Sequence, residues 1–197
     1  MRHINYKPFD KATSERWDLV SKKRTAELFL NNPSFWGRGE CEIDWDFIGK
    51  DFKTEQFCKG DIKIINRREG TELVIEAEVR EDFNNYDKIV SSKFDTIHVP
   101  ARKEQERGFF DAYIGFHADM NHFYLISSQD VLSSKIVTRM TKKPGGERGP
   151  DDFFDVYREY AALYTVDEDC KIITVRPGLW HSDMKDLWVP SRTYATV

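Results

Sequence analysis

The spacing of hydrophobic and polar residues predicts one long helix near the start of the chain, followed by a series of short strands. Residues 14–31 carry apolar side chains from Trp17 to Leu30 at helical spacing, and Asn31-Asn32-Pro33 ends the run. Ser14 is the expected N-cap of this helix. The stretch 35–57 mixes aromatic residues with glycines and acids, which predicts a loop with short extended pieces.

The pattern that follows predicts a β-hairpin. Residues 61–65 are predicted to form a short strand, and 66–70 a turn that ends on Gly70, the residue type best suited to positive φ. Residues 73–79 are rich in strand-forming residues and are bounded by charges. We therefore expect an antiparallel pair of strands, 61–65 and 73–79.

Four later segments, 96–99, 112–116, 122–126 and 171–175, are also predicted strands. Residues 127–132 are typical of a short capped helix, 153–163 of a strand or short helix, and 82–93 of an irregular or helical segment. A helix followed by many strands predicts a mixed α+β fold with a central mixed sheet and an N-terminal helix. The expected organisation is a core over 1–140, a basic Gly/Pro linker or loop over 141–152, and C-terminal strands with an aromatic tail over 153–197, packed on the same domain.

Composition narrows the class of protein. The chain has 197 residues, of which 40% are hydrophobic and 14% aromatic, as expected of one folded domain. Three widely spaced cysteines without a CxxC pair indicate reduced thiols. No leader peptide or membrane-length apolar run is evident, so we expect a cytoplasmic protein that does not enter membranes. A net charge of −4 argues against coating nucleic acid, yet it is compatible with an acidic active site.

Three carboxylates form the clearest candidate site. Glu76 and Glu78 are alternate residues of the second hairpin strand, so they share one face. The hairpin brings Asp61 alongside them on the neighbouring strand. Clustered carboxylates repel one another, and a hard divalent cation such as Mg²⁺, or Mn²⁺, removes that repulsion. Such an ion supports hydrolysis of a phosphodiester.

At these residues the chain resembles the PD-(D/E)xK nuclease superfamily, which has the restriction-endonuclease-like fold. Asp61 would be the acid of the first hairpin strand, and Glu76-Ala77-Glu78 the (D/E)xK triplet, with Glu78 in place of the motif lysine. Glu27 matches in kind a glutamate that members often carry on the first helix. The resemblance covers about residues 14–130 and implies a Mg²⁺- or Mn²⁺-dependent endonuclease or exonuclease acting on nucleic acid, DNA rather than RNA. Asp61 and Glu76 would bind the metal ion, and a homodimer is left open.

The chain departs from the family pattern in two ways. Gly60 stands where the family has proline, and no lysine follows Glu76 at the motif spacing. Lys103 is a candidate for the missing lysine if the third predicted strand lies beside the second. The residues expected to hold a nucleic-acid backbone are basic: Arg67, Arg68, Arg80, Arg102, Lys142, Lys143 and Arg148.

Other interpretations stay open. Glu76 and Glu78 could instead be the solvent-facing positions of an edge strand, although Asp61 at the start of the preceding strand argues against this. The chain could be a non-catalytic, partner-binding or inhibitory protein of a phage or mobile element, with its aromatic residues in an interface. His181, in Pro177-Gly178-Leu179-Trp180-His181, resembles a short stretch of some cupin-like lyases and would suit a small-molecule enzyme. His117 and His122 flank a turn that contains Asp119, which would allow a transition-metal site, although their spacing matches no zinc signature.

Overall fold

The computed structural model describes residues 11–33, 35–36, 40–45, 61–80, 95–101, 110–142 and 147–178. Several predicted features lie outside these ranges and have no structural outcome: the segment 82–93, Cys58, Arg102, Lys103, Lys143 and His181.

The predicted N-terminal helix is present as α1, Lys11–Asn31. It begins before the expected start, so Ser14 lies inside the helix and is not its N-cap. Ala12 is a strong helix former, which helps to extend the helix ahead of the apolar run. Ala26, Leu28 and Phe29 are buried on the side of α1 that packs against a sheet.

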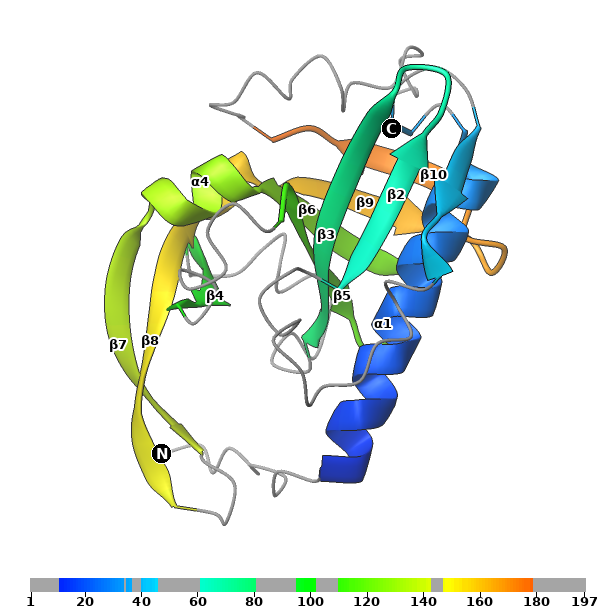
Figure 1. Ribbon diagram of the computed structural model, residues 1–197. Helices are drawn as coiled ribbons and strands as arrows, with labels where there is room; N and C mark the ends of the chain where they lie inside the picture. The colour runs from blue at the N-terminus through cyan, green and yellow to red at the C-terminus, as the bar shows by residue number, and fades with distance from the viewer. Residues whose placement is uncertain are drawn as a thin grey trace.

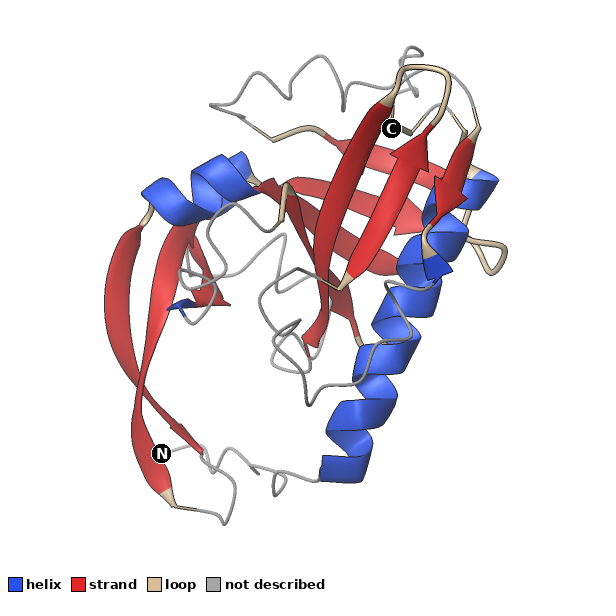
Figure 2. Cartoon of the chain, viewed as in Figure 1, coloured by secondary structure: helices blue, strands red, loops and turns tan. Residues whose placement is uncertain are grey.

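The larger of two sheets has seven strands in the order β1-β2-β3-β5-β6-β9-β10, and α1 crosses one of its faces (Figures 1 and 2). All neighbours run antiparallel except β3 and β5, which are parallel, so the sheet is mixed and the predicted mixed α+β class is confirmed. The strands are β1 (Cys41–Ile43), β2 (Ile62–Asn66), β3 (Thr71–Arg80), β5 (Ala112–His117), β6 (His122–Ser127), β9 (Ala162–Val166) and β10 (Ile172–Arg176).

The predicted hairpin is confirmed as β2 and β3. Ile62 stands opposite Ile75, and Asn66 opposite Thr71. Gly70 has a φ of 65°, a conformation that costs glycine little because it has no Cβ. The pattern of strand residues around one turn therefore correctly predicted the antiparallel pairing of these two strands.

A smaller sheet has the order β4-β8-β7, with β4 (Thr96–Pro100), β7 (Lys135–Lys142) and β8 (Arg148–Tyr157). The prediction of a linker over 141–152 is wrong at both ends, because β7 extends to Lys142 and β8 begins at Arg148. Side-chain hydrogen bonds from Thr138 to Asp152 and from Thr141 to Asp151 join these strands, an interaction that glycine and proline content does not reveal. The third predicted strand, β4, pairs with β8 rather than with β3.

Two short helices complete the described chain. Helix α4 (Ser128–Ser133) is capped as predicted, because Ser127 Oγ accepts the Asp130 N–H at 3.0 Å. The 3₁₀ helix η3 (Arg158–Tyr160) joins β8 to β9.

The two faces of the larger sheet pack against different partners. One hydrophobic cluster joins Ile75, Ala77 and Phe116 to α1, and we call this side of the sheet the helix face. A second cluster joins Tyr113 and Tyr124 to β4 and β8, and we call this side the inner face. Because side chains alternate along a strand, every second residue of β3 and β5 belongs to the inner face.

Candidate metal centre

The turn between β5 and β6 is organised around the carboxylate of Asp119. Its Oδ1 accepts two backbone hydrogen bonds, from Asn121 N at 2.8 Å and from His122 N at 3.1 Å. Aspartate commonly closes turns by accepting backbone N–H groups two or three residues later. The arrangement leaves Oδ2 directed at the residues on either side of the turn.

Two histidines converge on Asp119 Oδ2. His117, the last residue of β5, places Nδ1 2.9 Å from this oxygen, and His122, the first residue of β6, places Nδ1 2.7 Å from it. The ligand atoms of the three residues all lie within 4.8 Å of one another. This is the one such group of three His, Cys, Asp or Glu residues in the described part of the chain, and it could hold a metal ion.

The three ligand atoms are close enough to converge on one ion after a small outward shift. Ligand atoms about 2.1 Å from a tetrahedral ion lie about 3.4 Å apart. The Nδ1–Oδ2 distances of 2.9 and 2.7 Å are hydrogen-bond lengths, so the two imidazoles would move outward by about half an ångström to admit the ion. The Asp119 N–H also lies 3.2 Å from His117 Nδ1, so this nitrogen would exchange a backbone donor for the ion.

Electrostatics keep the central ligand ionised. Burial raises the pKa of Asp119, but the combined effect of the Asn121 N–H and the two neighbouring imidazoles is larger and lowers it. The pKa of Asp119 therefore lies below its ordinary value. A carboxylate that stays charged at neutral pH is what a cation site requires. The ring of His117 is nearly buried, at 9% exposed, and its Nε2 has no hydrogen-bond partner among the described residues. Nδ1 is the ring nitrogen that faces Asp119, so it is the atom that could contact an ion held there.

Arg24 of α1 holds this turn from the other side. Its Nε donates to Met120 O at 3.2 Å, and Nη2 donates to Asn121 Oδ1 at 3.2 Å. The same guanidinium donates to the backbone oxygens of Asp167 at 2.8 Å and Glu168 at 3.0 Å. One side chain therefore ties the β5–β6 turn to the turn between β9 and β10.

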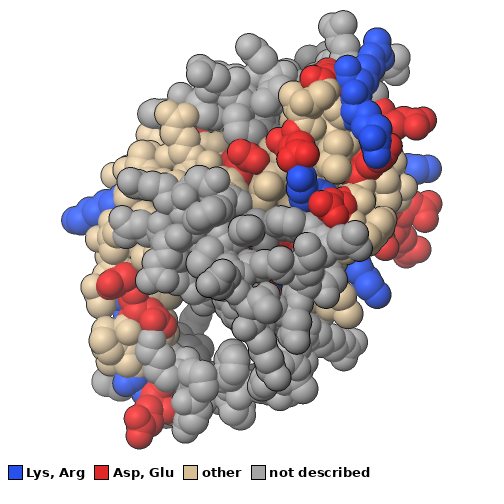
Figure 3. All heavy atoms as spheres, viewed as in Figure 1, with Lys and Arg blue, Asp and Glu red and all other residues tan. Residues whose placement is uncertain are grey.

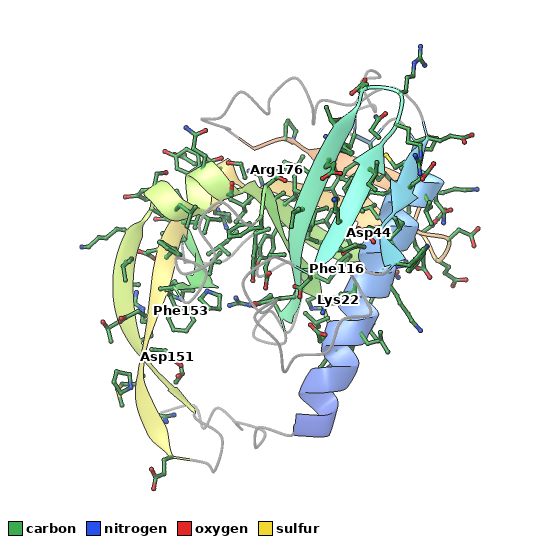
Figure 4. The ribbon with its side chains drawn as sticks, viewed as in Figure 1. Lys22, Asp44, Phe116, Asp151, Phe153 and Arg176 are labelled. Carbon is green, nitrogen blue, oxygen red and sulfur yellow. The ribbon has the colours of Figure 1, made fainter. Side chains whose placement is uncertain are left out.

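Asp61, the acid on which the sequence-based site depended, faces α1. Its Oδ1 lies 3.2 Å from Lys22 Nζ, and its Oδ2 accepts the Ala77 N–H at 2.9 Å. Lys22 is labelled on α1 in Figure 4. It also pairs with Asp18 at 3.0 Å and is 8% exposed. Burial lowers the pKa of Lys22, but the two carboxylates outweigh this effect and leave the pKa above its ordinary value. The contacts of the Asp61 carboxylate are on the helix face.

Glu76 and Glu78 alternate with Ile75 and Ala77, so they belong to the inner face. Glu76 is buried, at 6% exposed. Glu78 Oε2 accepts the Tyr113 hydroxyl at 2.8 Å and lies 3.8 Å from Arg80 Nη1. The two glutamates thus share a face as predicted, but the three acids are not a convergent ligand group in the described structure.

The remaining predicted residues are dispersed. Arg80 donates to His98 O at 2.7 Å, which directs it toward β4. Glu27 is exposed and pairs with Arg24 at 3.2 Å, whereas the Asp61 carboxylate pairs with Lys22. Arg67 and Arg68 are exposed at the hairpin turn, where Arg67 pairs with Glu42 at 2.6 Å. Lys142 ends β7, and Arg148 begins β8.

The surface around the hairpin carries both signs of charge. On the face shown in Figure 3, basic and acidic side chains are interspersed over β1, β2 and β3. The Lys63–Glu72 and Arg67–Glu42 pairs account for part of this mixture. A mixed surface gives weaker attraction for a phosphate backbone than a uniformly basic one.

The sequence contained a signal for the metal group but none for its support. His117-x-Asp119-x-x-His122 spans a turn between two predicted strands, which brings both histidines to one end of a hairpin. Arg24 is far away in the chain and lies on an otherwise ordinary helix, so only the packing of α1 across the sheet identifies its role.

Comparisons with known proteins give no relative. No family model matches the chain, and no curated protein or solved structure matches it. Within the described ranges, none of the helices combines the length and the apolar character that crossing a membrane requires.

Proposed function

We propose that the protein is a metal-dependent hydrolase whose single divalent ion is held by His117, Asp119 and His122. The convergence of two imidazole nitrogens on one carboxylate oxygen is the observation that supports this function. Two imidazoles favour Zn²⁺, or Fe²⁺ among redox-active ions, over the Mg²⁺ expected from the carboxylate cluster.

Three protein ligands are typical of catalytic sites, since they leave coordination positions for water and substrate. A bound Zn²⁺ ion supplies Lewis acidity and makes water ionisable near neutral pH. The residues of the chain have separate tasks. His117 and His122 donate neutral nitrogen ligands, Asp119 balances part of the charge, and the backbone of the turn fixes the orientation of the carboxylate.

Calorimetric titration of the apoprotein with Zn²⁺, Co²⁺, Fe²⁺ and Mg²⁺ tests the proposal. We expect one Zn²⁺ per chain and weak or no Mg²⁺ binding. Asp119→Asn keeps an oxygen for the Asn121 and His122 N–H groups but removes the charge, so its affinity for Zn²⁺ should fall by at least about 100-fold. His98→Gln, on β4, is the matched control. Equal Zn²⁺ binding by wild type and Asp119→Asn would overturn the proposal.

A second candidate function is phosphodiester hydrolysis of nucleic acid, with DNA as the expected substrate and Mg²⁺ or Mn²⁺ as the ion. The order of elements supports it, because a first helix is followed by an antiparallel hairpin and then by β5 parallel to β3. Glu76 and Glu78 would provide the carboxylates on the inner face. For Asp61 to join them, its carboxylate would have to leave Lys22 and turn away from the helix face.

Plasmid, single-stranded DNA and RNA, each incubated with Mg²⁺, Mn²⁺ or Zn²⁺, separate the two candidates. Cleavage that is lost in Glu76→Gln but kept in His122→Ala would support the nuclease site. Cleavage lost in His122→Ala and kept in Glu76→Gln would assign hydrolysis to the metal centre. A lack of cleavage in all three substrates removes the nuclease candidate.

A further inference from the structure

The support of the metal centre is concentrated in one side chain. Arg24 makes four hydrogen bonds to two separate turns, at distances between 2.8 and 3.2 Å. Two of these bonds are accepted by Met120 O and Asn121 Oδ1. Met120 and Asn121 are the two residues that directly follow Asp119 in the turn. Arginine suits such a task because its planar guanidinium presents several donors in a fixed geometry.

The two turns that Arg24 joins share an unusual backbone. Among the described residues, the non-glycine residues with positive φ are Met120, at 61°, and Cys170, at 62°. Met120 lies in the β5–β6 turn, and Cys170 closes the turn whose Asp167 and Glu168 oxygens accept from Arg24. Left-handed backbone is unfavourable for side chains with a Cβ, so it persists only where surrounding contacts hold it.

The conformation of Met120 matters for the ligand geometry. Asp119 Oδ1 accepts from Asn121 N and His122 N, and these two groups follow Met120 in the chain. If Met120 relaxed to an ordinary conformation, the two N–H groups would move away from Oδ1 and the carboxylate would lose its fixed orientation. Oδ2 would then no longer lie between the two Nδ1 atoms.

We infer that Arg24 is a positioning residue for the metal centre, which preorganises Asp119 by holding the left-handed turn at Met120. The inference rests on the proposed metal site at His117, Asp119 and His122. The hydrogen bonds of Arg24 to the β5–β6 turn end on Met120 O and Asn121 Oδ1, which are not among the three metal-ligating side chains, so Arg24 would act through the turn. It sets metal affinity and coordination geometry, in addition to its contribution to folding.

The test uses the full chain with two probe ions, Zn²⁺ in competition with a chromophoric chelator and Co²⁺ observed by its visible absorption. Arg24→Ala should weaken Zn²⁺ binding about 10- to 100-fold, the range found when groups behind metal ligands are removed. At saturating Co²⁺ its absorption spectrum should also differ from that of the wild type. Arg24→Lys, which keeps one charged donor, should recover part of the Zn²⁺ affinity. This variant takes the place of Arg24→Ala in the test if Arg24→Ala does not fold.

Asn31→Ala is the matched control. Asn31 Nδ2 donates to Asp169 O at 2.7 Å, so this variant loosens the β9–β10 turn without touching the β5–β6 turn. Its Zn²⁺ affinity should stay within about twofold of the wild type, because no group behind a metal ligand is removed. Equal losses of Zn²⁺ affinity in Arg24→Ala and Asn31→Ala, or no loss in Arg24→Ala, would overturn the role of Arg24. Neither result would contradict the metal site itself. Absence of binding in the wild type would overturn both.

Discussion

The carboxylate of Asp61 accepts the backbone N–H of Ala77 at 2.9 Å, at the point where β2 begins and β3 continues past it. The Asp61 N–H donates to Ile75 O, although Ile75 is already the register partner of Ile62. Asp61 therefore lies outside the regular β2–β3 ladder. Its side-chain carboxylate, rather than a backbone carbonyl of β2, accepts the Ala77 N–H. Its other oxygen pairs with Lys22, which joins the sheet to α1.

This relationship predicts that Lys22→Met is strongly destabilising. The variant leaves the largely buried carboxylates of Asp18 and Asp61 without their cation, and removing one partner of a buried pair costs about 3–5 kcal/mol. We expect a loss of about 2–4 kcal/mol in the free energy of unfolding, because both carboxylates keep some contact with solvent. Urea denaturation measures it, and Lys23→Met, at an exposed position of the same helix, should change little. A loss no larger than that of the control would contradict a structural role for Asp61.

The hairpin, β5, β6 and α1 could all be predicted because each depends on residues close together in the chain. The direction of the Asp61 side chain could not, because it depends on Lys22, which only the packing of α1 brings into reach. The sequence did identify that Glu76 and Glu78 share a face, since strand alternation alone determines it. The sequence does not show on which face of the sheet the Asp61 side chain lies, because Asp61 is outside the regular β2–β3 ladder and strand alternation does not apply to it.

The smaller sheet illustrates a different limit. Glycine and proline between residues 141 and 152 indicated a linker, but paired side chains such as Thr138 and Asp152 extend the ladder into it. Composition reports the flexibility of an isolated segment and contains no information about a partner strand. The pairing of β4 with β8 is likewise a long-range choice that no local pattern encodes.

The close approach of Tyr124 to Gly115 predicts that a side chain at position 115 is destabilising. A Cβ at this position would overlap Cζ, Oη and Cε1 of Tyr124, whose ring lies over β5 on the inner face. Gly115→Ala should therefore lower the free energy of unfolding by about 1–3 kcal/mol, the usual cost of overpacking a core. In the double variant Gly115→Ala, Tyr124→Leu, the loss should be smaller than the sum of the single losses. Urea denaturation measures these losses. If the loss in the double variant equals the sum of the single losses, overlap with Tyr124 is not the cause of the destabilisation by Gly115→Ala.

The environment of His98 predicts a loss of stability in acid. Burial lowers its pKa, and the charges of Arg139 and Arg80 lower it further, while Asp155 opposes them. Protonation therefore favours the unfolded chain, whose histidine has a pKa of about 6.5. The stabilising contribution is complete above that pH and is lost as pH falls through the folded-state pKa.

His98→Gln should accordingly flatten the dependence of unfolding free energy on pH between about 7.5 and 5.5. Chemical denaturation at several pH values, compared with wild type, measures the difference in slope. Lys23→Met, at an exposed position of α1, is the control and should keep the wild-type slope. An unchanged slope in His98→Gln would contradict the assigned direction.

Zinc should stabilise the folded chain through the metal centre. A ligand at 100 times its dissociation constant adds about 2.7 kcal/mol when it binds only the folded state. We expect a rise in melting temperature on adding Zn²⁺, its reversal by a chelator, and no rise in His122→Ala. Thermal unfolding followed by circular dichroism provides the measurement, and Lys23→Met is the matched control. A similar rise in His122→Ala would point to ions bound elsewhere.

The parallel pairing of β3 with β5 has a consequence for how the chain folds. The hairpins β2–β3, β5–β6 and β7–β8 each join neighbours in the chain, and such contacts form quickly because little loop entropy is lost. The β3–β5 ladder instead closes over the residues between Arg80 and Ala112, and β4 from within that interval joins the other sheet. High-contact-order steps of this kind limit folding rates. Substitutions at the β3–β5 ladder should thus slow refolding more than those within any one hairpin.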